Sequence, residues 1–286
     1  MTRGKPRNDH VEIVIQAHGN QGAYWKEIWR YRELIYFLCW RDVLVRYKQT
    51  AIGVMWAVLR PVLTIVVFSS FGALFHIDTH GSERLLLVSA GTLPWMLFSS
   101  GLQEASMSLV SNANLLTKVY FPRLIVPLSA IFVCLVDFLI ALLILAGLMI
   151  YYAKTPGMDV VFLPMFLILA LFSTAGSGVL LSALTVKYRD FRYVVPFLIQ
   201  LGFFVSPIGF SSADVYSSGR IPGWVKFIYS LNPMVAVIEG FRWSLLRDRF
   251  LAQWTVVGLS GVVALSLAFI GCWYFRKVEI QFADII

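Results

Sequence analysis

Six long apolar runs divide this chain and decide the solvent in which it folds. Each is close to the length of about 20 mostly apolar residues that a helix needs to cross a bilayer. The fourth and the sixth run carry no charged residue, and a soluble core does not require uncharged stretches of that length. The pattern therefore predicts an all-α membrane protein with six transmembrane helices, at about residues 52–75, 85–110, 124–152, 160–186, 193–212 and 254–275.

Composition and charge agree with this class. Only 14% of the residues are charged and 58% are hydrophobic, whereas soluble domains carry about 25% charged residues. With the N-terminus inside, the predicted cytoplasmic segments hold 16 of the 24 Lys and Arg residues, the outside segments hold seven, and Arg60 lies within the first span. This bias follows the positive-inside rule and predicts that both termini are cytoplasmic. It also argues that the net charge of +8 serves the membrane topology rather than binding to nucleic acid.

Two domains are expected: a cytoplasmic N-terminal segment, residues 1–50, and a membrane domain, residues 51–286. Within the first, Tyr24–Trp40 has the pattern of an amphipathic helix. Its apolar face would carry Trp25, Ile28, Trp29, Ile35, Tyr36 and Cys39. Aromatic and basic residues together suit a helix in the lipid headgroup zone. Packing on the chain's own polar loops is the alternative.

The outer segment Ser212–Gln253 is too apolar for a solvated loop and is interrupted by Pro222 and Pro233. Each half is too short to cross the membrane. Irregular backbone at membrane depth survives only against protein or a water-filled cavity. We expect two short re-entrant helices in the outer leaflet; a seventh span is disfavoured by Lys226, Glu239 and Arg242.

The sequence lacks the motifs of several chemistries. It has no GxxxxGK[ST] loop for ATP, no HExxH or CxxC metal spacing and no GxSxG elbow. The three cysteines are expected to pack as small apolar residues. Glu104, Asp137, Asp190 and Glu239 are scattered over different depths, which disfavours an integral-membrane enzyme, and only Asp137 resembles the buried acid of an ion-coupled carrier. We therefore expect no catalytic residue, no metal site and no cofactor bound by this chain.

The most informative polar segment is the turn after the second span, Ser111–Ser129. Its middle, Leu115–Phe121, is a short apolar and basic stretch that ends at Pro122. A short helix parallel to the membrane would expose side chains on which a partner could dock: Leu116, Val119, Tyr120 and Phe121. The alternative is a turn tucked under its own helical bundle.

Four segments carry a family resemblance, in order and with consistent spacing: RDVLVRYKQTAIGVMWAVLRP (Arg41–Pro61), NLLTKVYFPRLIVPLS (Asn114–Ser129), VKYRDFRYVVPFLIQLGFFVSPIGFS (Val186–Ser211) and LNPMVAVIEGFRWSLL (Leu231–Leu246). They resemble the membrane-spanning subunits of ABC-type polysaccharide exporters, and the O-antigen export permeases most of all. Export of teichoic acid, capsule, lipid or drug is the alternative within this class.

The resemblance implies a homodimer in the bacterial inner membrane, served by two copies of a separate cytoplasmic ATPase that binds ATP and Mg²⁺, and a lipid-linked polysaccharide as substrate. It implies that the turn is the helix that couples to the ATPase, with Asn114, Leu115, Leu116, Lys118, Val119, Tyr120, Phe121 and Arg123 as its residues. It also implies an outer gate that includes Pro222, Trp224, Tyr229, Pro233, Glu239 and Arg242.

A conduit for sugars is expected to offer aromatic platforms and few ionic traps. The candidates are Trp56, Trp95, Phe98, Phe203 and Phe204, although aromatic belts occur at every membrane interface. Arg60 is a candidate to grip a lipid pyrophosphate in a bidentate pair; snorkelling to the headgroups is the alternative. Asp137 is expected to hydrogen-bond a neighbouring helix, with a place in the lining of the pore as the alternative. The small residues near Gly176 are expected to permit close helix packing, with a dimer seam as the alternative.

Overall fold

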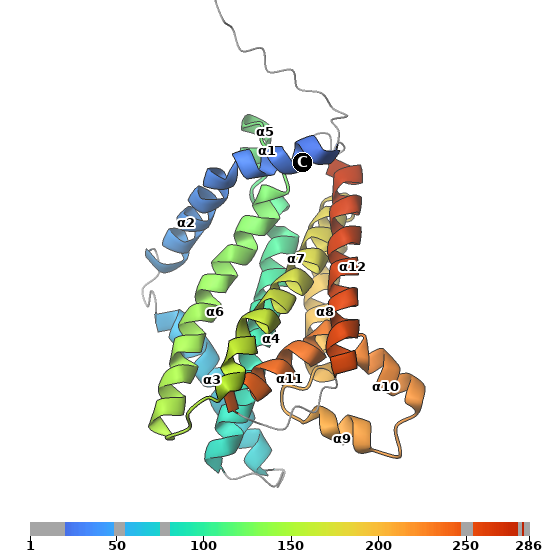
Figure 1. The fold of residues 1–286 in the computed structure, drawn as a ribbon. Coiled ribbons are helices and arrows are strands. Elements are labelled where there is room, and N and C mark those ends of the chain that lie inside the picture. Colours follow the sequence, from blue (N-terminus) through green and yellow to red (C-terminus); the bar gives the residue numbers. More distant parts are fainter. Residues whose placement is uncertain (1–20, 49–54, 75–80, 247–253, 280–281, 283–286) are drawn as a thin grey trace, which may run out of the picture.

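The computed structural model describes residues 21–48, 55–74, 81–246, 254–279 and Phe282, and within these ranges the chain forms helices and turns without any strand. In chain order (Figure 1) the elements are α1 (Gln21–Arg30), α2 (Arg32–Lys48), α3 (Met55–Leu74), α4 (Gly81–Ser111), α5 (Ala113–Lys118), α6 (Ile125–Tyr151), the 3₁₀ helix η1 (Met158–Phe162), α7 (Leu163–Lys187), α8 (Phe191–Val205), α9 (Ser212–Ser217), α10 (Gly223–Ser230), α11 (Pro233–Leu246) and α12 (Trp254–Glu279).

The long helices α4, α6, α7 and α12 run along the length of the molecule (Figure 1). One end carries α1, α5 and the last turn of α12, and the opposite end carries α9, α10 and α11. The short helix α5 therefore lies at the same end as α1, although residues 31–112 separate them in the sequence.

Among the described residues, four helical segments are long and apolar enough to cross a membrane: Leu85–Ser111, Ile125–Tyr151, Met158–Lys187 and Trp254–Glu279. The other two predicted runs form α3, of 20 residues, and α8, of 15 residues. The fifth span was predicted to reach residue 212, and this is wrong: α8 ends at Val205, and Ser206 is extended. The following Pro207 disfavours a helical conformation at residue 206. At 1.5 Å per residue, α8 is only about 23 Å long.

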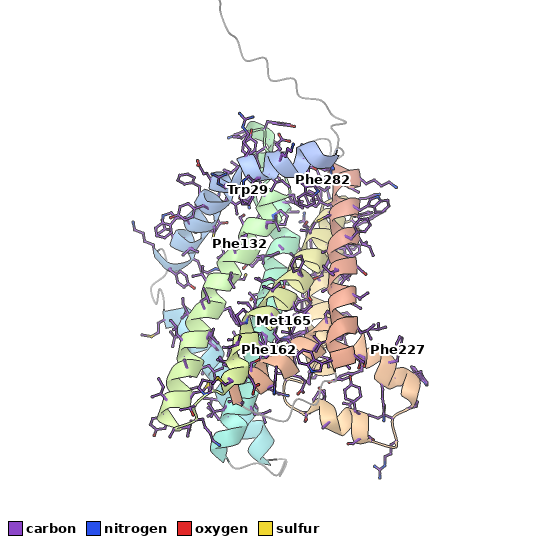
Figure 2. All side chains as sticks on the ribbon, in the orientation of Figure 1. Trp29, Phe132, Phe162, Met165, Phe227 and Phe282 are labelled. Atoms are coloured by element: carbon purple, nitrogen blue, oxygen red, sulfur yellow. The ribbon has the colours of Figure 1, made fainter. Side chains whose placement is uncertain are left out.

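The N-terminal segment is helical, as the pattern of Tyr24–Trp40 predicted, but it forms two helices that meet at Tyr31, and the second continues past Trp40 to Lys48. The predicted apolar face is divided. Trp29 and Tyr36 are exposed, and Ile35 packs with the buried Leu38 against the rest of the chain (Figure 2). On the predicted face, Trp29 and Tyr36 therefore point away from the protein, and Ile35 points into it.

Contacts at Asp137 explain why α2 extends so far. Its carboxylate accepts hydrogen bonds from Arg46 Nη1 and from the Tyr47 hydroxyl, both near the end of α2. Arg46 Nη2 also donates to Glu104 Oε1 on α4 over 2.9 Å. The prediction that Asp137 bonds a neighbouring helix is confirmed, and the same contacts attach α2 to both α4 and α6.

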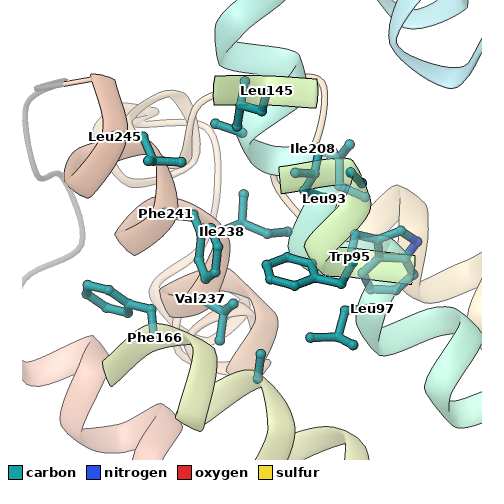
Figure 3. Close-up of a cluster of buried hydrophobic side chains, with 14 of the residues drawn as sticks. Leu93, Trp95, Leu97, Leu145, Phe166, Ile208, Val237, Ile238, Phe241 and Leu245 are labelled. Atoms are coloured by element: carbon teal, nitrogen blue, oxygen red, sulfur yellow. The ribbon is translucent and has the colours of Figure 1, made fainter. Parts of the chain in front are cut away.

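The core consists of separate clusters. The main one joins α4, α6, α7 and α11, and its members include Trp95, Phe166, Val237 and Phe241 (Figure 3). A second cluster lies at the α5 end and contains, among others, Leu38, Phe121, Phe275 and Phe282. The two ends of the bundle are thus packed by different residues.

Glycines permit the close contact of α7 with α12. A Cβ on Gly176 would lie 2.5 Å from the main-chain nitrogen of Ala268, and a Cβ on Gly271 would lie 2.4 Å from the main-chain oxygen of Gly176. Only glycine allows backbones to approach this closely. The close packing that the sequence predicted near Gly176 is confirmed.

Candidate functional site

The predicted docking turn follows directly from the end of α4. Asn112 breaks the helix and holds the break in place: its side-chain amide donates to the Ser108 carbonyl over 2.9 Å, and its side-chain oxygen accepts from Arg41 Nη2 over 2.9 Å. The six-residue α5 then ends at Lys118, because Val119 adopts an extended conformation. A short helix exists as predicted, but it begins and ends earlier than Leu115–Phe121.

Exposure divides the turn into two halves. Val119 and Tyr120 are 52% and 59% exposed, Asn114 and Lys118 are also exposed, and Phe121 is only 4% exposed. The expectation that Phe121 is available to a partner is therefore wrong. Val119 is extended, so the chain leaves the helix at this residue. Tyr120 faces out, and Phe121 enters the second cluster. Leu115 and Leu116 are half-buried against that cluster.

Arg123 and Glu279 anchor the far side of the turn. The main-chain N–H of Arg123 donates to Glu279 Oε1 over 3.0 Å, and Arg123 Nη1 donates to the Glu279 carbonyl oxygen over 2.6 Å. The Tyr24 hydroxyl donates to Glu279 Oε2 over 3.1 Å. Burial raises the pKa of Tyr24, and the nearby carboxylate raises it further, so the hydroxyl remains a donor. The turn, α1 and α12 thus meet at one carboxylate.

Sequence reasoning did not identify Glu279 or Tyr24 as parts of this site. Glu279 follows two basic residues near the end of the last apolar run, and no local pattern distinguishes it. The Arg276 guanidinium carbon lies 4.3 Å from the centre of the Tyr24 ring and completes the junction.

Three of the five candidate channel aromatics meet between α4 and α8. The Trp95 ring centre lies 5.5 Å from that of Phe98 and 6.0 Å from that of Phe203. Trp95 is only 5% exposed, whereas Phe204 on the outer side of α8 is 70% exposed. Trp56 and Arg60 lie on α3, and their side chains fall outside the part of the chain that the structure describes.

The free side of α8 carries a row of exposed apolar side chains: Tyr193, Phe197, Leu201 and Phe204. Their spacing of four, four and three residues places them on one face of the helix. An apolar row of this length on a monomer indicates a surface that meets lipid, another copy of the chain or a substrate.

The predicted outer gate contains a buried ion pair. Glu239 and Arg242 on α11 are 4% and 1% exposed, and Arg242 Nη1 lies 3.3 Å from Glu239 Oε1. The guanidinium also donates to three main-chain oxygens: Leu87 at 3.2 Å, Phe210 at 3.0 Å and Ile208 at 2.8 Å. Glu239 Oε1 accepts from the main-chain nitrogen of Ser212 at 3.1 Å and from its hydroxyl at 2.8 Å. These bonds hold α11, α4 and the segment 208–212 together.

The other candidates for the outer gate separate into surface and interior. Pro222 precedes α10 and Pro233 opens α11, so both prolines mark helix starts. Trp224 is 67% exposed on α10, while Tyr229 is buried and lies 3.3 Å from the Ser212 hydroxyl. Phe227 also projects from α10 (Figure 2). The side of α10 away from the bundle is therefore apolar.

The described residues contain no group of three or more His, Cys, Asp and Glu side chains that could hold a metal ion. What the geometry offers is an exposed apolar turn at one end of a bundle of long apolar helices, an aromatic helix face along it and a tightly bonded cap at the other end.

Comparison with known proteins gives a consistent result. The ABC-2 type transporter family matches residues 33–246. An O-antigen export system permease protein RfbA of Klebsiella pneumoniae is 26% identical over 259 residues, which cover 89% of this chain and 95% of that protein. The protein of the same name in Myxococcus xanthus is 26% identical over 243 residues, covering 85% of this chain and 91% of that protein.

Proposed function

Since the chain belongs to the ABC-2 type transporter family, we propose that it is the membrane-spanning subunit of an ATP-driven exporter that moves a lipid-linked polysaccharide of the O-antigen type across the bacterial inner membrane. The observation that carries this proposal is the similarity to O-antigen export permeases over 85% to 89% of the chain. The long apolar helices supply the multi-pass membrane domain that such a subunit requires.

ATP hydrolysis falls to a separate cytoplasmic subunit, because the sequence has no phosphate-binding loop of its own. The docking turn is the contact for that subunit. Its exposed Val119 and Tyr120 lie at the end of the bundle where α1 and the last turn of α12 also lie (Figure 1). Basic residues are concentrated in the segments at this end, which supports a cytoplasmic position for it and for both termini.

In the lipid bilayer, α3 and α8 complete a set of six spans with the four long helices. The exposed aromatic side chains of α1 and α2, such as Trp29 and Trp40, lie in the headgroup zone. The short helices α10 and α11 enter the outer leaflet from the other side and close the conduit there.

Two copies of the chain frame the conduit, with the exposed row on α8 facing the space between them. Tyr193, Phe197 and Phe204 present aromatic rings there. These rings can stack on the apolar faces of sugar rings, and they carry no charge that would bind the polysaccharide too tightly to move. On another side of α8, Phe203 packs against Trp95 of α4 and attaches the two helices to each other. The role proposed for Arg60 is to bind the pyrophosphate of the lipid carrier.

The experiment that tests this function is reconstitution of the chain with its ATPase subunit in lipid vesicles loaded with radiolabelled lipid-linked O-antigen. We expect ATP-dependent transfer of the label across the bilayer and none with an ATPase subunit that cannot hydrolyse ATP. Transfer of a teichoic acid, capsular or lipid substrate, with none of the O-antigen carrier, would assign the chain to another exporter. Transfer without nucleotide would overturn the proposal altogether.

A further inference from the structure

The last turn of α12 holds the docking turn through both the side chain and the main chain of Glu279. Both Glu279 carboxylate oxygens are used: Oε1 accepts from the Arg123 main chain, and the Tyr24 hydroxyl lies 3.1 Å from Oε2 and 3.3 Å from Oε1. The Glu279 carbonyl oxygen accepts from the Arg123 guanidinium. Hydrogen bonds to an ionised carboxylate are about twice as strong as neutral ones. The bonds come from three separate segments, so one side chain fixes their relative orientation.

Apolar packing reinforces the same junction. Phe121 from the turn is buried in the cluster that also contains Phe275, Val278 and Phe282, which are 0%, 3% and 1% exposed. Figure 2 shows Phe282 beside α1 at this end of the molecule, and the Arg123 guanidinium carbon lies 6.0 Å from its ring centre. A displacement of the turn must therefore move the end of α12 or break the junction.

The helix that would receive this displacement is closely packed along its length. Gly176 and Gly271 bring α7 and α12 into backbone contact, and interiors packed this tightly transmit strain. At its other end, α12 begins at Trp254, whose ring centre lies 6.0 Å from that of Trp243 on α11. A continuous set of packed elements thus connects the docking turn with the outer cap.

We propose that Glu279 is the positioning residue that locks the docking turn to α12, so that ATP-driven displacement of the turn is passed along the α7–α12 pair to α11 and the outer cap. This inference rests on the proposed function, since it requires an ATPase on the turn. It assigns to Glu279 a role in coupling that is separate from binding of the ATPase, because Glu279 bonds within the junction, whereas the docking side chains of Val119 and Tyr120 are exposed.

The variant that isolates this role is Glu279→Gln. Glutamine keeps the volume and one acceptor oxygen for Arg123, and the apolar cluster around Phe121 is untouched. It removes the charge, and its amide nitrogen cannot accept the Tyr24 hydrogen bond that Oε2 takes over 3.1 Å, which leaves only the longer 3.3 Å contact of the Tyr24 hydroxyl with Oε1. The matched control is Glu33→Gln, the same change at an exposed carboxylate near the start of α2.

The readout is the distance between spin labels on Thr117→Cys and Ile228→Cys, measured by pulsed electron paramagnetic resonance with and without vanadate-trapped nucleotide. Thr117 lies exposed on α5 and Ile228 exposed on α10, and the native Cys39, Cys134 and Cys272 are first replaced by alanine. Trapping should change the distance distribution in the labelled parent chain and in Glu33→Gln. In Glu279→Gln the ATPase should still bind, but trapping should leave the distance distribution as it is without nucleotide. Export per ATP hydrolysed should fall about tenfold, the factor that loss of one charge-assisted hydrogen bond produces.

A full nucleotide-dependent change in Glu279→Gln, with unchanged export per ATP, would overturn the inference while leaving the proposed function intact. Failure of the labelled parent chain to bind the ATPase would instead overturn the proposed function. If Glu279→Gln does not fold, Tyr24→Phe provides the same test, because it removes a single hydrogen bond and leaves the carboxylate on Arg123. It should give a smaller loss of coupling in the same direction, and an unchanged coupling ratio in that variant would count against the inference.

Discussion

The docking turn and the Glu239–Arg242 cluster lie at opposite ends of the molecule and differ in how they use polar and apolar side chains. At the turn, Val119 and Tyr120 are apolar or aromatic and exposed. In the cluster, Glu239 and Arg242 are charged and almost completely buried, and each is hydrogen-bonded to neighbouring segments. An exposed apolar patch indicates a surface for a partner, whereas a buried ion pair that is hydrogen-bonded to several segments fixes the geometry of its own chain. The family resemblance implies a function for both regions, and in the structure they differ in exposure and bonding.

The largest effect is expected at the buried pair. Arg242→Met leaves the Glu239 carboxylate buried without its cation, and breaking such a pair costs about 3–5 kcal/mol. We expect a large loss of folded protein, measured as a lower thermal midpoint in detergent by fluorescence-detected size exclusion. Arg220→Met, at an exposed position on the same side of the molecule, is the control. Equal stability of the two variants would contradict the stabilising role of the Glu239–Arg242 pair.

The next effect separates the two halves of the turn. Phe121→Ala removes a ring from the second cluster and should cost about 3 kcal/mol of unfolding free energy. Tyr120→Ala, one residue earlier, should leave the thermal midpoint nearly unchanged, because its ring is 59% exposed. If Tyr120→Ala destabilised the chain as much as Phe121→Ala, the division of the turn into an anchored and an exposed half would be wrong.

A smaller effect is expected where α2 meets the bundle. Asp137→Asn removes the charge that pairs with Arg46, and both side chains are about 30% exposed, so the loss should be roughly 1–2 kcal/mol. The change should appear as faster tryptic cleavage within α2, because this helix loses its attachment to α6. Asp42→Asn, which affects only a surface pair with Arg41, should leave cleavage unchanged. Equal protection in both variants would contradict the role given to Asp137.

The smallest effect on stability should accompany the clearest loss of binding. Tyr120→Glu changes an exposed side chain, so its effect on unfolding should stay within about 0.5 kcal/mol. A buried charge in the interface with the ATPase should nevertheless weaken that complex at least tenfold, since truncated or mismatched central residues commonly cost about 2 kcal/mol or more. Co-purification at graded ATPase concentrations measures this, and Thr117→Glu on the same turn tests how far the interface extends.

The sequence predicted the features that depend on local pattern. The long apolar helices α4, α6, α7 and α12 follow from run length alone, because a bilayer demands a fixed number of apolar residues. The short helix of the docking turn follows from an apolar stretch that a proline ends. Close packing at Gly176 follows from its small neighbours, although its partner Gly271 was not identified.

The features that the sequence did not reveal depend on distant contacts. Whether Phe121 faces in or out is decided by the cluster at the end of α12. The bond between Tyr24 and Glu279 joins residues 255 positions apart, and neither residue stands out locally. The end of α8 shows a further limit. The helix stops at Val205, two residues before Pro207, although the apolar run of the sequence continues past that proline.

The central proposal is that the ATPase subunit binds the end of the bundle that exposes Tyr120. A photo-crosslinking amino acid placed at Tyr120, and separately at Ile228 on α10, tests this directly in the assembled transporter. We predict a crosslink to the ATPase from position 120 and none from position 228. A crosslink from position 228, or an intact complex with no crosslink from position 120, would contradict the account.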